Sequence, residues 1–179
     1  RAYRAVASIC CRWRQRVVAK VSFRKHGFRG AAGGGGGGNL MAHASYLQRD
    51  GAEREGEKGR FYDGREDEVL DAQDRLQDWA QSDNRHFRIT LAPESGARLV
   101  AEDGHLKEFT RDTMARMERD LGVQLEWVGI DHHNTDNPHT HVIVRGVRRD
   151  GVELIIPRQY VSHGLREAAR DVATEQIGE

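Results

Sequence analysis

Alternating apolar and polar residues predict β-strands along this chain. The predicted strands are residues 17–24, 86–91, 124–130, 139–147 and 152–156. Apolar residues spaced three and four apart predict helices at residues 40–48, 66–80, 104–121 and 157–177. Residues 51–68 are charged and rich in turn formers, so we expect a surface loop there.

The order of these elements predicts an α+β fold. Strands alternate with helices, but Asp150-Gly151 is a strong signal for a tight hairpin between the last two strands. A hairpin joins antiparallel strands, so we expect a central, largely antiparallel sheet flanked by helices rather than a doubly wound parallel one. We expect the glycine-rich residues 27–38 to form a flexible insert, since they lack the spacing of a phosphate-binding loop.

Charge is distributed unevenly along the chain. The 179 residues contain 28 Lys and Arg and 28 Asp and Glu, yet residues 1–49 hold ten basic residues and no acidic one. A basic segment on an acidic body is typical of proteins that bind a polyanion, most often nucleic acid, although an Arg-rich targeting peptide has the same composition. We expect residues 1–15 to form a basic, disordered arm and residues 16–179 to form one folded domain.

Composition also bears on the compartment. No apolar run approaches the ~18 residues of a membrane-spanning helix, so we expect no membrane partner. Cys10 and Cys11 are adjacent and cannot build a disulfide framework, which indicates a reducing compartment such as the cytoplasm. The chain begins without Met and ends abruptly at Glu179, so we expect it to be part of a longer protein.

Three histidines are spaced to bind a metal. His139 and His141 begin an apolar strand two residues apart, so both rings lie on one face. The turn formers that precede them can fold the chain back and bring His132 to the same pair. Solvated loop histidines are the alternative, but three converging imidazoles favour one divalent ion such as zinc or manganese. We expect His133 to point away from His132.

The sequence shows no obvious base that would activate a metal-bound water, so another group is expected to be the nucleophile. Tyr46, on the helix after the basic strand, is the first candidate, and Tyr160 is the second. A phenol that attacked a phosphodiester would form a phosphotyrosine bond and release a 3′-hydroxyl. His43 lies three residues before Tyr46 on the same helical face, where it either accepts the phenolic proton or is simply exposed.

Two motifs resemble those of a known family. Residues 132–141, with the spacing His-x6-His-x-His and Asn-Pro before the pair, closely resemble the third motif of conjugative DNA relaxases of the HUH endonuclease superfamily. Residues 46–49, Tyr-Leu-Gln-Arg, resemble their first motif, which holds the nicking tyrosine. The chain is most similar, from about Arg16 to its end, to the mobilisation branch that includes the T-DNA border nuclease, and there to relaxases with an extra C-terminal domain of unknown function.

This resemblance implies a relaxase fold and a metal-dependent transesterase that nicks one DNA strand at a plasmid transfer origin to initiate conjugative transfer. Tyr46 would attack the scissile phosphate and stay bound to the 5′ end. His132, His139 and His141 would hold one divalent ion (Mn, Mg or Zn). The implied setting is the bacterial cytoplasm, with single-stranded DNA, accessory relaxosome proteins and the coupling protein of a type IV secretion system as partners.

One position departs from the relatives, which often carry His-x-Asp where this chain has Asn134 as the third residue. The carboxylate that would orient a ligand histidine is therefore missing there, and Asp131 or Asp136 could replace it. DNA contacts are expected from Lys20, Arg24, Arg49, Arg88 and Arg145. For the last two, which fall on predicted strands, a buried ion pair is an equal alternative.

Other functions use parts of the same pattern. Replication initiators and transposases of the same superfamily share the chemistry, but their histidines usually precede the tyrosine, the reverse of the order here. A non-catalytic DNA-binding module with a structural metal would normally need four ligands. A single-metal hydrolase that attacks with bound water would not need Tyr46.

Overall fold

The computed structural model describes residues 14–26, 37–50, 59–94, 105–133 and 136–177. Within these ranges the strands are β1 (Val17–Lys25), β2 (Arg85–Pro93), β3 (Trp127–His132) and β4 (His139–Arg145). The helices are α1 (Gly37–Asp50), α2 (Ala72–Ser82), α4 (His105–Leu121) and α5 (Leu165–Ile177), the last preceded by a π-helical turn, η1 (Tyr160–Gly164). None of the described helices combines the length and apolar character needed to cross a membrane.

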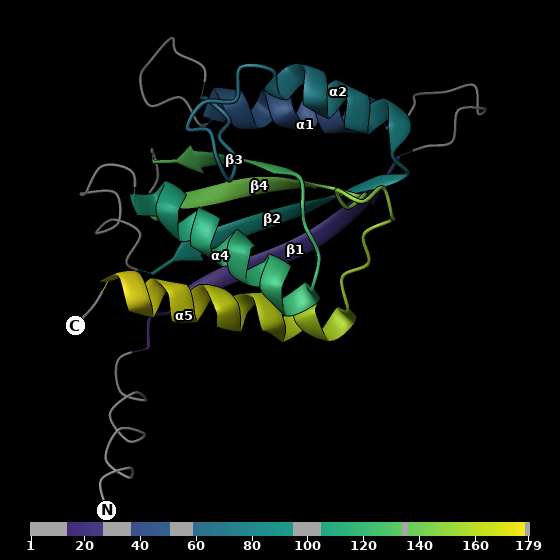
Figure 1. Ribbon diagram of the computed structural model, residues 1–179. Coiled ribbons are helices and arrows are strands. Elements are labelled where there is room, and N and C mark those ends of the chain that lie inside the picture. The colour runs from purple at the N-terminus through teal and green to yellow at the C-terminus, as the bar shows by residue number, and fades with distance from the viewer. Residues whose placement is uncertain (1–13, 27–36, 51–58, 95–104, 134–135, 178–179) are drawn as a thin grey trace, which may run out of the picture.

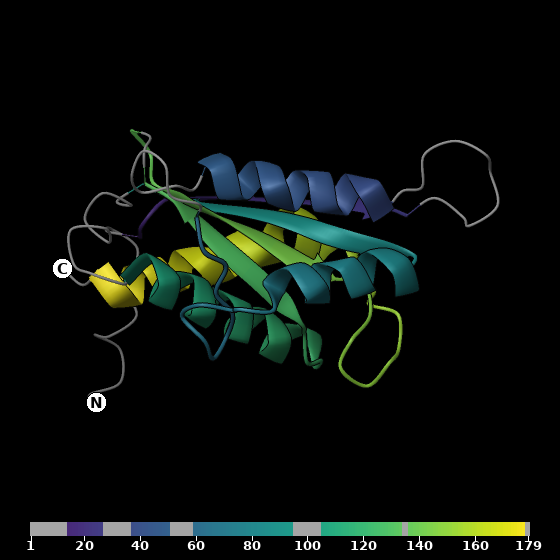
Figure 2. The same cartoon turned by 90° about the horizontal axis from the view of Figure 1, so that it is seen from above.

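In the described part of the chain, the strands form one antiparallel sheet in the order β1-β2-β4-β3. Helices α1 and α2 lie on one face of this sheet, and α4 and α5 lie on the other (Figure 1). Seen from above, α1 and α2 run beside each other over the strands (Figure 2). The predicted α+β fold with an antiparallel sheet is therefore confirmed.

Each face of the sheet has its own apolar core, because successive side chains of a strand point to opposite faces. Val142 of β4 packs with Phe109 in the core beneath α4 and α5. Its neighbour Ile143 belongs instead to the core beneath α1 and α2, with Leu47 and Trp79. These side chains are almost fully buried, and each such burial stabilises the fold by about 1.5–3 kcal/mol.

The hairpin predicted at Asp150-Gly151 forms only in part. Gly151 has φ of 81°, a left-handed conformation that suits glycine, so the turn itself is present. The strand predicted at residues 152–156 does not form, and an isolated bridge is all that pairs it with the end of β4. Leu154 is buried in the core beneath α4 and α5 and Ile156 packs partly against it, whereas Val152 and Ile155 are largely exposed, so only part of this segment is buried.

The expected surface loop contains two buried aromatic residues. Phe61 and Tyr62 are almost fully buried, and Tyr62 forms a bridge with Gly129 of β3. A pair of aromatic residues within a charged segment is too short to show a periodic pattern, which is why the sequence did not reveal this burial. Residues 51–58 of the same loop lie outside the described residues.

The expected N-terminal arm and glycine-rich insert fall mostly on residues 1–13 and 27–36, outside the described residues. Arg14 and Gln15, which we expected in the arm, are attached to α5. Arg14 is ion-paired with two carboxylates of that helix, and the backbone N–H of Gln15 donates to the Thr174 hydroxyl. These contacts extend the folded part of the chain beyond the predicted boundary.

Candidate active site

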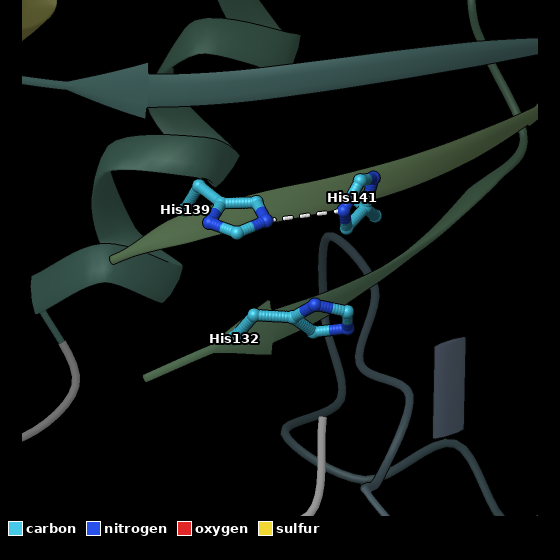
Figure 3. Close-up of side chains that lie close together, drawn as sticks. All are labelled: His132, His139 and His141. Carbon is cyan, nitrogen blue, oxygen red and sulfur yellow. Dashed lines mark hydrogen bonds between the residues drawn. The ribbon is translucent and has the colours of Figure 1, made fainter. Parts of the chain in front are cut away.

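The three predicted metal ligands converge at one end of the β3–β4 hairpin. In the strand register His132 pairs with His139, and Ile130 pairs with His141. Because residues two apart share a face of a strand, the three rings project from the face that carries α1. One nitrogen of each ring lies within 4.8 Å of the other two, and the rings are turned toward one another (Figure 3).

Hydrogen bonds indicate which nitrogens of the β4 histidines face each other. His139 Nδ1 lies 2.9 Å from the carbonyl oxygen of Asn137, so this nitrogen donates its proton there and Nε2 keeps its lone pair. His141 Nδ1 contacts the Thr90 hydroxyl at 3.3 Å. The two Nε2 atoms lie 3.2 Å apart, a separation that requires either a shared proton or a shared cation between them.

His132 links this cluster to α1. Its Nε2–H donates to the backbone carbonyl of Leu47 at 3.1 Å, a buried hydrogen bond between residues far apart in the sequence. Nδ1 is then the nitrogen of His132 that would bind a metal. Leu47 directly follows Tyr46, so the helical turn that carries this tyrosine is attached to the histidine cluster.

The donor set fits a divalent metal ion. Three imidazoles suit zinc or manganese and leave coordination positions for a substrate, as catalytic rather than structural sites do. The second nitrogen of each ring has a hydrogen-bond partner, the arrangement that orients metal-binding histidines. The backbone carbonyls of Leu47 and Asn137 therefore accept the hydrogen bonds that orient His132 and His139, the role that we expected of a carboxylate. Asp131 faces the opposite side of the sheet, and Asn134 lies outside the described residues.

A buried polar network supports the cluster from the other face of the sheet. Asp131 Oδ1 accepts hydrogen bonds from the Tyr62 hydroxyl at 2.7 Å and from Thr140 Oγ1 at 2.6 Å. Gly129 makes room for this tyrosine, since a Cβ there would lie only 3.0 Å from its ring. The network fixes the backbone beside the three histidines, and we did not predict it from the sequence. Strand alternation, which puts Asp131 and Thr140 opposite the histidines, was the available signal.

Tyr46 is the most exposed of the tyrosines that the structure describes. The residue is 51% exposed, whereas Tyr62 is fully buried, and burial raises the pKa of Tyr62 well above its usual value. Tyr160 packs against the core beneath α4 and α5, where burial and a 3.0 Å hydrogen bond to Asp120 raise its pKa. A raised pKa opposes the loss of the phenolic proton that attack requires.

Basic residues share the face of the sheet that carries the histidines. Strand alternation places Lys20 and Arg24 of β1 on this face, both exposed, and Arg88 on the same face of the adjacent β2. A cavity of about 710 Å³, bordered by Lys20, Thr90 and Asn137, continues this surface to the histidines. Thr90 hydrogen-bonds to His141, and the Asn137 carbonyl to His139, so the cavity lies next to the histidine cluster.

The other two predicted DNA contacts differ in their surroundings. Arg49 is exposed in the last turn of α1, three residues after Tyr46. Arg145 lies at the end of β4 away from the histidines, where its guanidinium contacts the Asp83 carboxylate at 2.9 and 3.2 Å and Glu126 at 3.2 Å. These carboxylates raise the pKa of Arg145. The geometry thus favours the ion pair for Arg145 and gives no support to a phosphate contact there.

His43 is half buried beside the basic face. Its pKa is lowered to about 4, first by burial and then by the positive charges of Arg88 and Arg24. The imidazole is therefore neutral at pH 7 and has a lone pair that can accept a proton. The sequence allows His43 either to be simply exposed or to accept the phenolic proton, and the neutral state of the half-buried ring is compatible with the second role.

His86 of β2 predicts acid sensitivity of the fold. It is fully buried, and its pKa is lowered to about 3, first by burial and then by the charge of Arg88. Below pH 6.5 the unfolded chain therefore binds a proton that the folded chain does not, so stability falls as the pH is lowered. Between pH 6.5 and pH 5 this group should cost about 2 kcal/mol of unfolding free energy.

Urea unfolding at pH 7 and pH 5 measures this effect. The His86→Gln variant, which cannot titrate, should lose about that much of the pH dependence, whereas His163→Gln, at an exposed position, should keep it. Equal pH dependence in the wild type and His86→Gln would show that His86 does not titrate as described.

Comparison with known proteins gives one family. The sequence model for the relaxase family, described as MobA/VirD2-like, nuclease domain, matches residues 46–176, more than half of the chain. The matched range begins at Tyr46 and includes the three histidines. No curated protein matches the chain.

Proposed function

The chain belongs to the MobA/VirD2-like relaxase nuclease family, and on this basis we propose that it nicks one strand of DNA at a plasmid transfer origin through a covalent phosphotyrosine. The observation that carries the proposal is the hydrogen bond from His132 to Leu47. It joins the turn that carries the exposed Tyr46 to the histidine cluster, so nucleophile and metal ligands belong to one site.

In the proposed reaction the Tyr46 hydroxyl oxygen attacks the phosphorus of the scissile phosphodiester. The new bond joins this oxygen to the phosphorus, and the bond from the phosphorus to the 3′ oxygen breaks. The phosphorus remains on the 5′ end of the downstream strand, which stays attached to Tyr46, while the 3′ oxygen of the upstream strand takes up a proton and leaves as a hydroxyl. Because one phosphoester replaces another, the step is reversible and permits later rejoining.

His43 is proposed to accept the phenolic proton of Tyr46. It is neutral at pH 7 and lies one helical turn before the tyrosine. In the absence of DNA its pKa of about 4 makes it a weak base. Phosphates bound near Arg24 and Arg88 would offset the positive charges that lower this pKa, so binding of DNA should make His43 a stronger base.

His132, His139 and His141 would hold one divalent ion. When bound, this ion supplies positive charge that attracts the oxygens of the scissile phosphate and offsets the charge that develops on them. Manganese, magnesium and zinc are the candidates, and the three nitrogen ligands favour manganese or zinc over magnesium.

The DNA strand is proposed to lie along the basic face of β1 and β2. Lys20 and Arg24 are exposed there, Arg88 is on the adjacent strand, and Arg49 is at the end of α1. Such contacts bind phosphates irrespective of base sequence and hold the strand in register with the site. The proposed setting is the bacterial cytoplasm, with accessory relaxosome proteins and the coupling protein of a type IV secretion system as partners.

A covalent-adduct assay tests this function. The purified chain would be mixed with manganese and a 3′-end-labelled pool of single-stranded oligonucleotides of random sequence, then separated on a denaturing gel. We expect a labelled band at the position of the protein, lost when EDTA is present, and one recovered DNA sequence at the nick. Cleavage products without protein-bound label would instead indicate that water is the nucleophile.

A further inference from the structure

Two histidines outside the metal site form a hydrogen-bonded chain with Arg88. His86 Nε2 lies 3.0 Å from Arg88 Nε, and His86 Nδ1 lies 2.7 Å from His26 Nε2. His26 Nδ1 lies 2.7 Å from the backbone carbonyl oxygen of Asp83. His26 follows β1 and His86 lies near the start of β2, so the chain connects the two strands that carry the basic face.

The donor and acceptor of each hydrogen bond in this series follow from the two groups at its ends, the Arg88 guanidinium and the Asp83 carbonyl. Arginine has only donors, so Arg88 Nε–H donates and His86 Nε2 accepts. A neutral imidazole that accepts at one nitrogen carries its proton on the other, so His86 Nδ1–H donates to His26 Nε2. His26 in turn donates from Nδ1 to the carbonyl of Asp83, which can only accept. Both rings are therefore neutral, each held in one tautomer.

The end of this hydrogen-bond series at His26 and Asp83 is held by the sheet. The backbone N–H of His26 donates to the carbonyl of Asn84 at 2.7 Å, so His26 is held by its backbone as well as by its ring. The side chain of Asp83 is almost completely buried and forms an ion pair and two hydrogen bonds with the guanidinium of Arg145. A guanidinium tied through such a chain loses less rotational freedom when it binds a ligand.

Positive charge gathers around the other end of the chain. Arg88 shares its face of the sheet with Arg24, and the charge of each lowers the pKa of His43 on α1. The pKa of Arg88 is itself lowered, first by partial burial and then by the charge of Arg24. Positive groups held together in this way are stabilised by an anion, and a phosphodiester is the anion of the proposed substrate.

From this geometry we infer that His86 and His26 are positioning residues, which hold the Arg88 guanidinium on the basic face so that it binds a phosphate of the DNA strand. The inference rests on the proposed function for the identity of the anion. It assigns His26 and His86 a role that neither the histidine cluster nor the tyrosine motif gives them.

Two substitutions of His86 separate positioning from simple structural support. The Gln side-chain amide reaches the place of histidine Nε2, so His86→Gln keeps an acceptor for Arg88. The Asn amide reaches the place of Nδ1, so His86→Asn keeps the contact with His26 but loses the one with Arg88. Both remove the ring, so any loss due to packing should be similar in the two variants.

Affinity for a fluorescein-labelled single-stranded oligonucleotide of mixed sequence is the readout, measured by anisotropy in EDTA at several salt concentrations. We expect Arg88→Gln to weaken binding about tenfold and to reduce the salt slope by about 0.7. His86→Asn should weaken binding about fivefold, with His86→Gln within about twofold of wild type. In the Arg88→Gln background, His86→Asn should have no further effect. Arg148→Gln, in the turn after β4, is the control for loss of one charge and should bind like wild type.

Equal weakening by the two His86 variants, or none by either, would overturn the inference. A second measurement uses the wild-type chain and needs no variant to fold: two-bond proton–nitrogen NMR correlations report which ring nitrogen carries the proton. We expect the Nδ1–H form for both His26 and His86. An Nε2–H form of His86 would contradict the proposed series of hydrogen bonds from Arg88 to Asp83. An adduct in the assay above without this binding pattern would refute the positioning role alone. The binding pattern without an adduct would refute the phosphotyrosine mechanism alone.

Discussion

Replacing Tyr46 with Phe is expected to abolish the covalent protein–DNA adduct and to slow strand cleavage on the order of 10⁴-fold or more. The substitution removes only the hydroxyl oxygen, which is the proposed nucleophile, from a side chain that is half exposed. Folding should therefore be unchanged, and affinity for DNA should stay within about twofold of wild type, because the basic face is intact. The measurement is adduct formation on a denaturing gel with an oligonucleotide that carries the recovered nick sequence.

Two further variants make this result specific. Tyr160→Phe, which removes a hydroxyl on the other face of the sheet, should form the adduct at the wild-type rate. His43→Gln should still form it but about 10²-fold more slowly, if the imidazole accepts the phenolic proton. An adduct that persists in Tyr46→Phe would show that another residue is the nucleophile.

Replacing His141 with Ala is expected to weaken manganese or zinc binding at least about 100-fold and to abolish cleavage. The variant removes one of three ligand nitrogens and also the contact that this ring makes with Thr90. The position is partly exposed at the start of β4, and the apolar residues that follow it continue to hold the strand in the sheet. Equilibrium dialysis against each metal, followed by metal analysis of the protein, gives the stoichiometry and affinity.

His163 provides the matched control for loss of a histidine. It is exposed on η1 and contacts the neighbouring Ser162, and it does not belong to the cluster. His163→Ala should keep one tightly bound metal per chain and full cleavage. One tightly bound metal in the His141→Ala variant would show that the ligand set is wrong, whatever the effect on cleavage.

The candidate metal site could be predicted from the sequence because its three histidines are close along the chain. His139 and His141 share a face by strand periodicity alone, and a short connection returns the chain so that His132 joins them. The alternation of apolar and polar residues likewise predicted the strands, and the turn signal at Asp150-Gly151 predicted that the sheet is antiparallel. At residues 152–156, where Leu154 is buried but Val152 and Ile155 are largely exposed, the same alternation predicted a strand that does not form.

The surroundings of the arginines could not be predicted in this way. Periodicity alone gave Arg88 and Arg145 the same choice between a phosphate contact and a buried ion pair. Only the folded chain shows that Arg145 meets Asp83, whereas Arg88 meets His86 and lies beside Arg24. The partners come from separate segments whose approach depends on how the sheet is ordered.

The sequence by itself thus determined which residues share a face, where the hairpin that carries the histidines lies, and which tyrosine accompanies them in a recognisable motif. The tertiary structure alone decided that His132 hydrogen-bonds to the helical turn of Tyr46 and that Tyr62 supports the site from the other face of the sheet. It also decided that Arg88 hydrogen-bonds to His86, and His86 to His26. The physical reason is the separation of the interacting residues along the sequence. Side-chain direction follows from the backbone within a few residues, whereas hydrogen-bond partners far apart along the chain are set by the packing of the whole sheet with its helices.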